Sequence, residues 1–297
     1  MPGLRYLRRY LPQRRYLSRR IIARQQKTPD GMVRCFFIAD TAVLYYNSGR
    51  LSGEAGHMVK EDRLWPGGFR FFFDDTLFQP GTDSFLLGAF PRLHRGERVC
   101  DLGGGTGLLG LLLLAREPSV QITEVELQER SCALCRRAAE ENGLTGSVEC
   151  IEADLRRLSM LRPGSFDLVV TNPPYFAAGS GAESPDEARR AARSEVNCTL
   201  DDILCAAARL LRWGGRLCLV FRPERMAELM ESARRRGLEP KRLRFVQNTA
   251  GAAPSLFLLE CRRGGHTGLQ AEPPLVMYRS DGTPTAELDA AYFRDRG

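Results

Sequence analysis

Strand-like and helix-like segments alternate through the middle of the chain, and this order limits the possible folds more than any other feature. Apolar runs typical of strands occur at 98–102, 120–127, 148–153, 166–171 and 216–221. Segments with helical periodicity separate them at 108–116, 128–142, 200–212 and 223–236. The order predicts a mostly parallel, doubly wound α/β sheet, and ligands of such sheets bind at the carboxyl ends of the strands.

Two further strand signals, at 242–247 and 255–261, have no helix between them. They predict a C-terminal antiparallel hairpin at one edge, which gives a Rossmann-like sheet of seven strands. A short helix is expected at 85–90 with Thr82 or Asp83 as its N-cap. We expect the last 35 or so residues to be loop. No apolar run approaches the ~18 residues of a membrane span, so no membrane partner is expected.

The net charge of +7 is concentrated at the start of the chain. Residues 1–27 hold nine of the 43 Lys and Arg residues and none of the 36 acidic ones, so the remainder is close to neutral. We expect residues 1–57 to be a basic extension that is disordered or not part of the fold. Alternatives for this extension are an RNA-binding arm, a membrane-surface helix or a targeting peptide. Residues 58–297 are expected to form the functional domain.

Nine scattered cysteines predict reduced thiols in a cytoplasmic protein rather than a disulfide framework. Cys132 and Cys135 form a close pair within a helical segment. No second pair or Cys/His partner accompanies them in sequence, so core packing is favoured and no metal is expected.

The strongest motif is the sequence DLGGGTG at 101–107, between a strand and a helix. Glycines at Gly103, Gly105 and Gly107 let the backbone approach a ligand more closely than a Cβ would allow. Their spacing does not match the dinucleotide pattern G-x-G-x-x-G, which argues against a nicotinamide oxidoreductase.

Three acids follow or end neighbouring strands at the same rim. Glu126 is placed to accept hydrogen bonds from ribose hydroxyls, and Asp154 from an adenine amino group. Asp101 is expected near an ammonium group, which it would attract. Three carboxylates suit the cationic cofactor S-adenosylmethionine and would repel a pyrophosphate. Asp101 and Asp154 can also cap the following helices, and for Glu124 a structural role is favoured.

The fourth strand is followed by the sequence NPPY at 172–175. Pro173 and Pro174 cannot continue a sheet, so the chain must turn at the ligand rim. An exocyclic amine on a base is a poor nucleophile because its lone pair is delocalised. The Asn172 side-chain oxygen and the Pro173 carbonyl can accept its two N–H bonds and direct the lone pair at a methyl group. Tyr175 would stack on the base, a contact worth ~1–3 kcal/mol.

With these motifs the sequence resembles the class I S-adenosylmethionine-dependent methyltransferases that carry NPPY, and within them the bacterial valine-tRNA adenine-N6 methyltransferase family. The likeness extends roughly over residues 62–288 and includes QPGTDS at 79–84, VEL at 125–127, Gly264-Gly265 and PPL at 273–275. It implies a tRNA partner, methylation of the adenosine 3′ of the anticodon, and residues Gly81, Thr82 and Asp83 closing over the cofactor.

NPPY indicates a planar amine but leaves its carrier open. Protein glutamine-N5 methylation and ribosomal RNA guanine-N2 methylation are the alternatives, followed by a S-adenosylmethionine-binding module without turnover. For RNA, Arg189, Arg190 and Arg193 would contact phosphates, or they would lie on a solvated helix with acidic partners. The oligomeric state is open, and a monomer is compatible with the sequence.

Overall fold

The computed structural model describes residues 23–27, 33–39, 42–46, 59–74, 77, 80–173 and 198–296. The chain divides into two compact units, Met1–Gly49 and Arg50–Gly297. In the first unit three strands form an antiparallel sheet in the order β1-β2-β3: β1 Ala23–Lys27, β2 Val33–Ala39 and β3 Ala42–Tyr46. The sequence analysis assigned no strand to this segment. The extent of the functional domain stays a prediction.

The second unit is built on one large sheet with the strand order β13-β11-β12-β10-β9-β6-β7-β8, and β14 also pairs with β11. Its strands are β6 Arg98–Leu102, β7 Gln121–Glu126, β8 Val148–Glu152, β9 Phe166–Thr171, β10 Leu211–Phe221, β11 Leu238–Thr249, β12 Pro254–Arg263, β13 Gln270–Ala271 and β14 Leu275–Tyr278. The seven strands expected from the sequence are present. The β11–β12 hairpin is antiparallel as predicted, but β13 and β14 lie along its outer strand.

The five strands from β8 to β10 run parallel to one another. From β6 the chain proceeds outward through β7 and β8, and then returns to form β9 on the other side of β6. The direction of winding therefore changes between β6 and β9. In open α/β sheets this switch point is where ligands bind, outside the carboxyl ends of the strands.

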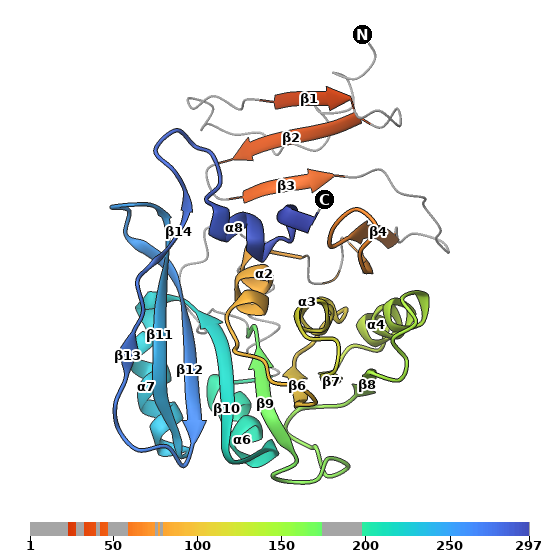
Figure 1. Cartoon of the computed structure of the whole chain (residues 1–297). Helices are drawn as coiled ribbons and strands as arrows, with labels where there is room; N and C mark the ends of the chain where they lie inside the picture. Colours follow the sequence, from red (N-terminus) through yellow and green to blue (C-terminus); the bar gives the residue numbers. More distant parts are fainter. Residues whose placement is uncertain are drawn as a thin grey trace, which may run out of the picture. The chain divides into compact units, whose positions relative to one another are not determined.

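Helices cover both faces of the sheet (Figure 1). They are α2 Thr82–Ala89, α3 Leu108–Arg116, α4 Glu129–Glu141, α6 Leu200–Leu210, α7 Met226–Arg235 and α8 Ala286–Ala291, with short 3₁₀ turns η1 Pro223–Arg225 and η2 Arg294–Arg296. Residues of α2, α3, α4 and α8 share one hydrophobic cluster, and those of α6 and α7 share the other. Among the described helices, none is long and apolar enough to cross a membrane.

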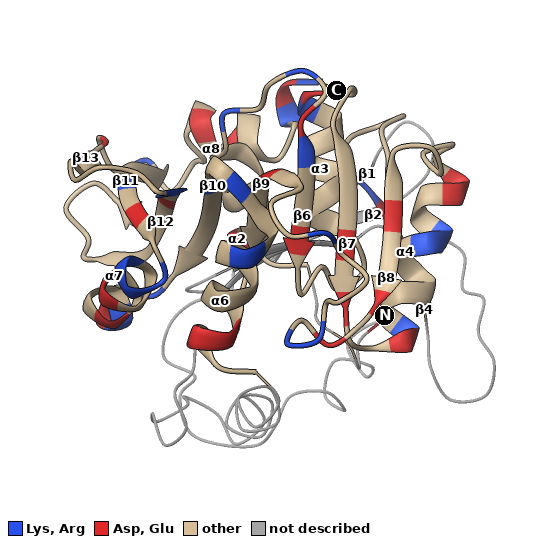
Figure 2. Cartoon of the chain, turned by 90° about the horizontal axis from the view of Figure 1, so that it is seen from below, with Lys and Arg blue, Asp and Glu red and all other residues tan. Residues whose placement is uncertain are grey.

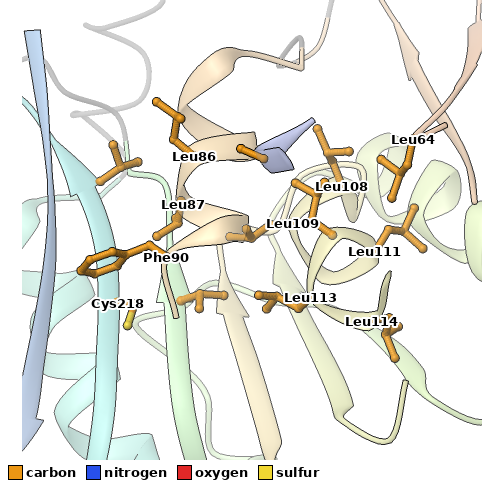
Figure 3. Packing of buried hydrophobic residues seen from close by; sticks show 14 of the residues in the cluster. Leu64, Leu86, Leu87, Phe90, Leu108, Leu109, Leu111, Leu113, Leu114 and Cys218 are labelled. Atoms are coloured by element: carbon orange, nitrogen blue, oxygen red, sulfur yellow. The ribbon is translucent and has the colours of Figure 1, made fainter. Parts of the chain in front are cut away.

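Helix α3 is apolar on all sides because it lies between α2 and the sheet. Every residue from Leu108 to Leu114 is buried, and Figure 3 shows its leucines packed beside Leu86, Leu87 and Phe90 of the α2 region. Each fully buried leucine contributes roughly 1.5–3 kcal/mol. A Cβ on Gly88 would lie 2.8 Å from Leu112 Cβ, so glycine there permits the close approach of the two helices.

The hairpin of β4 Val59–Arg63 and β5 Arg70–Asp74 is attached to the end of α4. The Arg70 backbone N–H donates to Asn142 Oδ1 at 2.8 Å, and Asn142 Nδ2 donates back to the Arg70 carbonyl at 2.7 Å. Asn142 therefore acts as an additional strand partner for β5.

The prediction that the last 35 residues are loop was wrong. They contain β13, β14, α8 and η2, because the tertiary contacts of this segment supply the apolar burial that its sparse hydrophobic pattern does not reveal. Leu288 and Phe293 are buried in the core with α2, and the Tyr292 ring stacks on Phe85 at 4.1 Å. One local signal was present, since the Thr285 side chain accepts a hydrogen bond from the Leu288 N–H and caps α8.

The predicted N-cap of α2 was also wrong. The helix begins at Thr82 with Gly81 as its N-cap, and no side chain caps it. Thr82 Oγ1 instead accepts a hydrogen bond from the Tyr292 hydroxyl at 2.9 Å. Asp83 lies in the first turn, where a negative charge interacts favourably with the helix dipole.

Candidate active site

The glycine loop 103–107 connects β6 to α3 at the switch point. Gly103, Gly105 and Gly107 have φ angles of +76°, +56° and +81°, which side chains with a Cβ rarely adopt. A Cβ on Gly103 or Gly105 would meet no atom within 4 Å, whereas on Gly107 it would lie 2.6 Å from Cys135 Sγ. The first two glycines therefore line open space, and the third is required for contact with α4.

Glu126, at the end of β7, is fixed against this loop. Its Oε2 accepts the Gly105 N–H at 2.9 Å, and its Oε1 accepts the Gln128 N–H at 2.8 Å. Each carboxylate oxygen can accept a second hydrogen bond. The predicted ribose-binding residue is thus held at the rim beside the glycine loop, with acceptor capacity left for a ligand.

Asp101 and Glu124 form a buried carboxyl pair beneath the loop. They are cross-strand neighbours in β6 and β7, are 2% and 0% exposed, and belong to the acidic segments of these strands in Figure 2. Burial, opposed by the hydrogen bond with Glu124, raises the pKa of Asp101 to about 7. Burial and the neighbouring Asp101 raise the pKa of Glu124 well above its usual range. The pair therefore holds a proton near neutral pH.

The Glu124 carboxyl lies between two glycines. A Cβ on Gly104 would be 2.0 Å from Glu124 Oε2, and one on Gly110 would be 2.1 Å from Oε1. The sequence analysis favoured a structural role for Glu124 and missed its pairing with Asp101, because the pairing depends on strand register. Glycine at Gly104 and Gly110 therefore leaves room for this carboxyl.

Asp154 follows β8 and is already paired. Its Oδ1 accepts from the Arg156 backbone N–H and from Nε, both at 2.9 Å, and its Oδ2 accepts from Arg156 Nη2 at 2.6 Å. The hydrogen bonds from Arg156 lower the pKa of Asp154. The carboxylate is ionised at the rim, and its expected interaction with an adenine amino group stays a prediction.

Asn172 is held at the end of β9 by a residue of α2. Its Nδ2 donates to Ser84 Oγ at 3.2 Å, and the preceding Thr171 Oγ1 donates to the Leu102 carbonyl at 2.8 Å. The amide oxygen lies on the opposite side of the planar group from Nδ2. Ser84 is a positioning residue that the sequence analysis did not single out, although it belongs to the QPGTDS motif.

The α2 N-terminus is thereby brought to the same rim. Ser84 lies in the first turn of the helix, so the Asn172 contact places Gly81, Thr82 and Asp83 near the end of β9. Pro173 is buried next to Asn172. The predicted residues Pro174, Tyr175, Arg189, Arg190 and Arg193 lie outside the described residues.

The site fits a cationic, adenosine-bearing cofactor. Gly103 and Gly105 leave open space at the switch point, and Glu126 retains acceptor capacity there. Asp101 Oδ1 is buried and has no N–H donor among the described residues, since its side-chain neighbour is the Glu124 carboxyl. An ammonium group would supply that missing partner. Groups of three or more His, Cys, Asp or Glu that could hold a metal ion do not occur in the described part of the chain.

A solved structure shares this fold. It is described as a predicted O-methyltransferase from Agrobacterium tumefaciens, and it matches with a TM-score of 0.58 and 22% identity over 71% of this chain and 95% of that chain. At such identity the likeness concerns the fold alone. Fold and site together define the class as α/β methyltransferases, enzymes that use S-adenosylmethionine as cofactor.

Sequence comparison places the chain within that class. The model of the family "Methyltransferase small domain" matches residues 73–236. A "tRNA1(Val) (adenine(37)-N6)-methyltransferase" from Serratia proteamaculans is 36% identical over 66% of this chain and 77% of its own. One of the same name from Yersinia pseudotuberculosis is 34% identical over 78% of this chain and 92% of its own. The chain belongs to the methyltransferase small domain family.

Proposed function

We propose that this enzyme methylates N6 of an adenine in tRNA, at the adenosine 3′ of the anticodon in valine tRNA. The relatives from Serratia proteamaculans and Yersinia pseudotuberculosis carry that activity in their names. The structural observation that carries the proposal is the Asn172–Ser84 hydrogen bond. It orients an amide acceptor at the cofactor rim, where an exocyclic amine would need it.

Five groups of the chain, together with Asn172, are proposed to hold the cofactor. The backbone at Gly103, Gly105 and Gly107 would lie against it, and Gly81, Thr82 and Asp83 would close over it. Glu126 would accept hydrogen bonds from the ribose hydroxyls, Asp154 from the adenine amino group, and Asp101 from the ammonium group. When bound, S-adenosylmethionine supplies an electrophilic methyl group.

The chemistry assigned to the chain itself is orientation of the amine. Asn172 Oδ1 and the Pro173 carbonyl accept its two N–H bonds, which favours tetrahedral geometry at nitrogen and directs the lone pair toward the methyl group. Ser84 keeps the Asn172 amide in this orientation. The predicted turn at Pro174 and the stacking of Tyr175 on the base complete the arrangement.

The remaining proposals concern the rest of the chain. Residues 58–297 are proposed as the methyltransferase domain, preceded by the basic extension 1–57. Arg189, Arg190 and Arg193 are proposed to contact RNA phosphates. A tRNA substrate, together with cysteines that are free thiols in the described residues, supports a cytoplasmic location.

Methyl transfer from labelled S-adenosylmethionine to RNA lacking the modification tests the proposal. We expect new N6-methyladenosine in the tRNA fraction. Asn172→Ala should lower kcat by about 10²–10³, by analogy with loss of one oxyanion-hole donor. Ser84→Ala removes only the positioning hydrogen bond, worth about 0.5–1.5 kcal/mol, and should lower kcat roughly 3–10-fold.

The two variants control for each other, because Ser84→Ala retains the amide acceptor while losing its anchor. Label found only in protein glutamine or in guanine would contradict the proposal. An Asn172→Ala enzyme with normal kcat would contradict the assigned role of the amide.

A further inference from the structure

A basic basin lies beside Arg216 of β10, on the side of the sheet where Arg242 contacts Phe90 at the end of α2. It has a volume of about 520 Å³ and is lined mainly by charged residues. These are Arg92, Arg216, Lys241, Arg242, Glu260 and Arg262. They come from the segment after α2 and from β10, β11 and β12, whose basic and acidic residues are coloured in Figure 2. The sequence analysis singled out none of them.

Part of this charge is used within the fold. Arg216 pairs with Glu97 at 2.6 Å, and Arg242 pairs with Glu260 at 3.0 Å and with Glu272 at 3.3 Å. Arg92 also lies 3.7 Å from Glu272. At the mouth of the basin, two of the described basic side chains lack carboxylate partners. Lys241 Nζ donates to the His266 carbonyl and Arg262 Nε to the Gly214 carbonyl, and neither residue forms an ion pair with any described carboxylate. The basin therefore carries an excess of positive charge at its mouth.

Arg242 is a buried member of the basin lining. It is only 7% exposed, and its guanidinium is fixed by the Phe90 carbonyl at 2.8 Å and by the Phe90 ring 4.0 Å away. Its Nε is buried and has no hydrogen-bond acceptor among the described residues. Buried donors without acceptors are rare and unfavourable, and this one is held in place because Glu260, Glu272 and Phe90 fix the rest of the guanidinium.

We propose that the basic basin binds the phosphodiester backbone of the substrate RNA. Arginine presents planar N–H donors that match phosphate oxygens, and lysine adds a point charge. The mouth is open, since the Arg92 side chain is 70% exposed and Leu269 is 44% exposed. An open mouth admits a polymer, whereas a free phosphate compound is usually enclosed by its site.

The position of the basin suits a contact away from the methylated base. From Arg216 to Phe221, at the carboxyl end of β10, the strand covers about 17 Å at roughly 3.3 Å per residue. This length corresponds to about five nucleotides of a stacked strand at ~3.4 Å each. The inference rests on the proposed function, and it adds a backbone contact to the base contact at Asn172.

The test uses the double variant Lys241→Ala, Arg262→Ala in the full-length protein. Both side chains lie at the mouth, so their removal should leave the fold intact. Each phosphate contact contributes about 0.7–0.9 to the slope of log affinity against log salt. We expect this slope for tRNA to fall by roughly 1.5, with KM for tRNA raised on the order of tenfold and kcat unchanged, as for loss of uniform binding.

The matched control is Arg234→Ala, Arg235→Ala on α7, which covers the other face of the sheet. It removes the same charge from exposed arginines that are already paired with Glu239 and Glu231. The control should retain the wild-type slope and KM. Equal slopes for all three proteins, or equal losses in both variants, would overturn the proposal.

Titration with inorganic pyrophosphate distinguishes a free phosphate compound from RNA. Loss of pyrophosphate binding in the mouth variant with unchanged tRNA binding would overturn the assignment to RNA. Methyl transfer by the wild type is read separately. No transfer despite a variant-specific change of slope contradicts the proposed function alone, and normal transfer with equal slopes contradicts the basin alone.

Discussion

The cofactor rim and the basic basin lie on one sheet and carry charges of opposite sign. At the rim, Asp101 and Glu124 are buried together and hold a proton between them. In the basin, Arg242 and Arg216 have carboxylate partners, while Lys241 at the mouth does not. Beyond residue 27 the chain has 34 basic and 36 acidic residues. Segregation of these charges allows a nearly neutral body to attract both a cationic cofactor and an anionic polymer.

Asp101→Asn is expected to have the largest effect on one site without affecting the other. Removing this carboxylate should weaken S-adenosylmethionine binding about 10–100-fold, because hydrogen bonds to charged groups contribute about 1.5–3 kcal/mol. The salt dependence of tRNA binding should not change. Titration calorimetry with the cofactor and tRNA binding at several salt concentrations measure the two effects. A variant with weaker tRNA binding and normal cofactor binding would abolish the distinction between the sites.

Gly110→Ala tests whether the acidic pair is built into the core. The new Cβ would lie 2.1 Å from Glu124 Oε1 and 2.9 Å from Ile122 Cγ2, and overpacking of this kind costs about 1–3 kcal/mol. Urea denaturation should show that loss. Adding Glu124→Ala creates space and should recover part of the loss produced by Gly110→Ala. Additive effects of the two substitutions would show that the glycine does not serve as a spacer.

A third prediction concerns pH. Asp101 has a pKa of about 7 in the folded protein, and an ammonium ligand binds its ionised form. Cofactor affinity should therefore increase about tenfold between pH 6 and pH 8. In the free protein the stability contributed by protonated Asp101 is fully present below its usual pKa of 3.8 and is lost as pH rises through about 7. Calorimetry across this range measures the affinity, and a flat profile in the wild type would refute the raised pKa.

The smallest expected effect is that of Tyr292→Phe. This change removes one hydrogen bond to Thr82 Oγ1 and keeps the ring stacked on Phe85, so stability should fall by about 0.5–1.5 kcal/mol. Denaturant midpoints provide the measurement. Tyr292→Ala, which also removes the stacking, should destabilise more; equal effects of the two would mean that the ring contact contributes nothing.

Much of the architecture was predictable where apolar runs are dense. The strands at β6 and β9 and helix α3 have the bounds expected from the sequence, because each is buried almost throughout. Elements whose burial depends on distant partners were not found. Helix α8 has few apolar residues of its own and is held by α2. The boundary between α6 and β10 was also misplaced, since α6 ends at Leu210 rather than at residue 212 and β10 begins at Leu211.

The two sites also differ in how far they could be predicted from the sequence. Glycines and acids at the ends of strands identify the cofactor rim, since strand ends in a parallel sheet meet at one edge. The Asp101–Glu124 contact could not be inferred, because it requires the register of β6 against β7. The basin was invisible to sequence reasoning, since its residues are spread from Arg92 to Arg262 and their charges cancel against acids in any count along the chain.

The contact between Tyr292 and Thr82 spans 210 residues of sequence. A ribosome adds ~5–20 residues per second, so about 10–40 s separate the synthesis of the two residues. Helix α2, and with it the Ser84 anchor of Asn172, lacks its final support during that interval. A growing chain can thus assemble most of the central sheet before α2 receives this last contact.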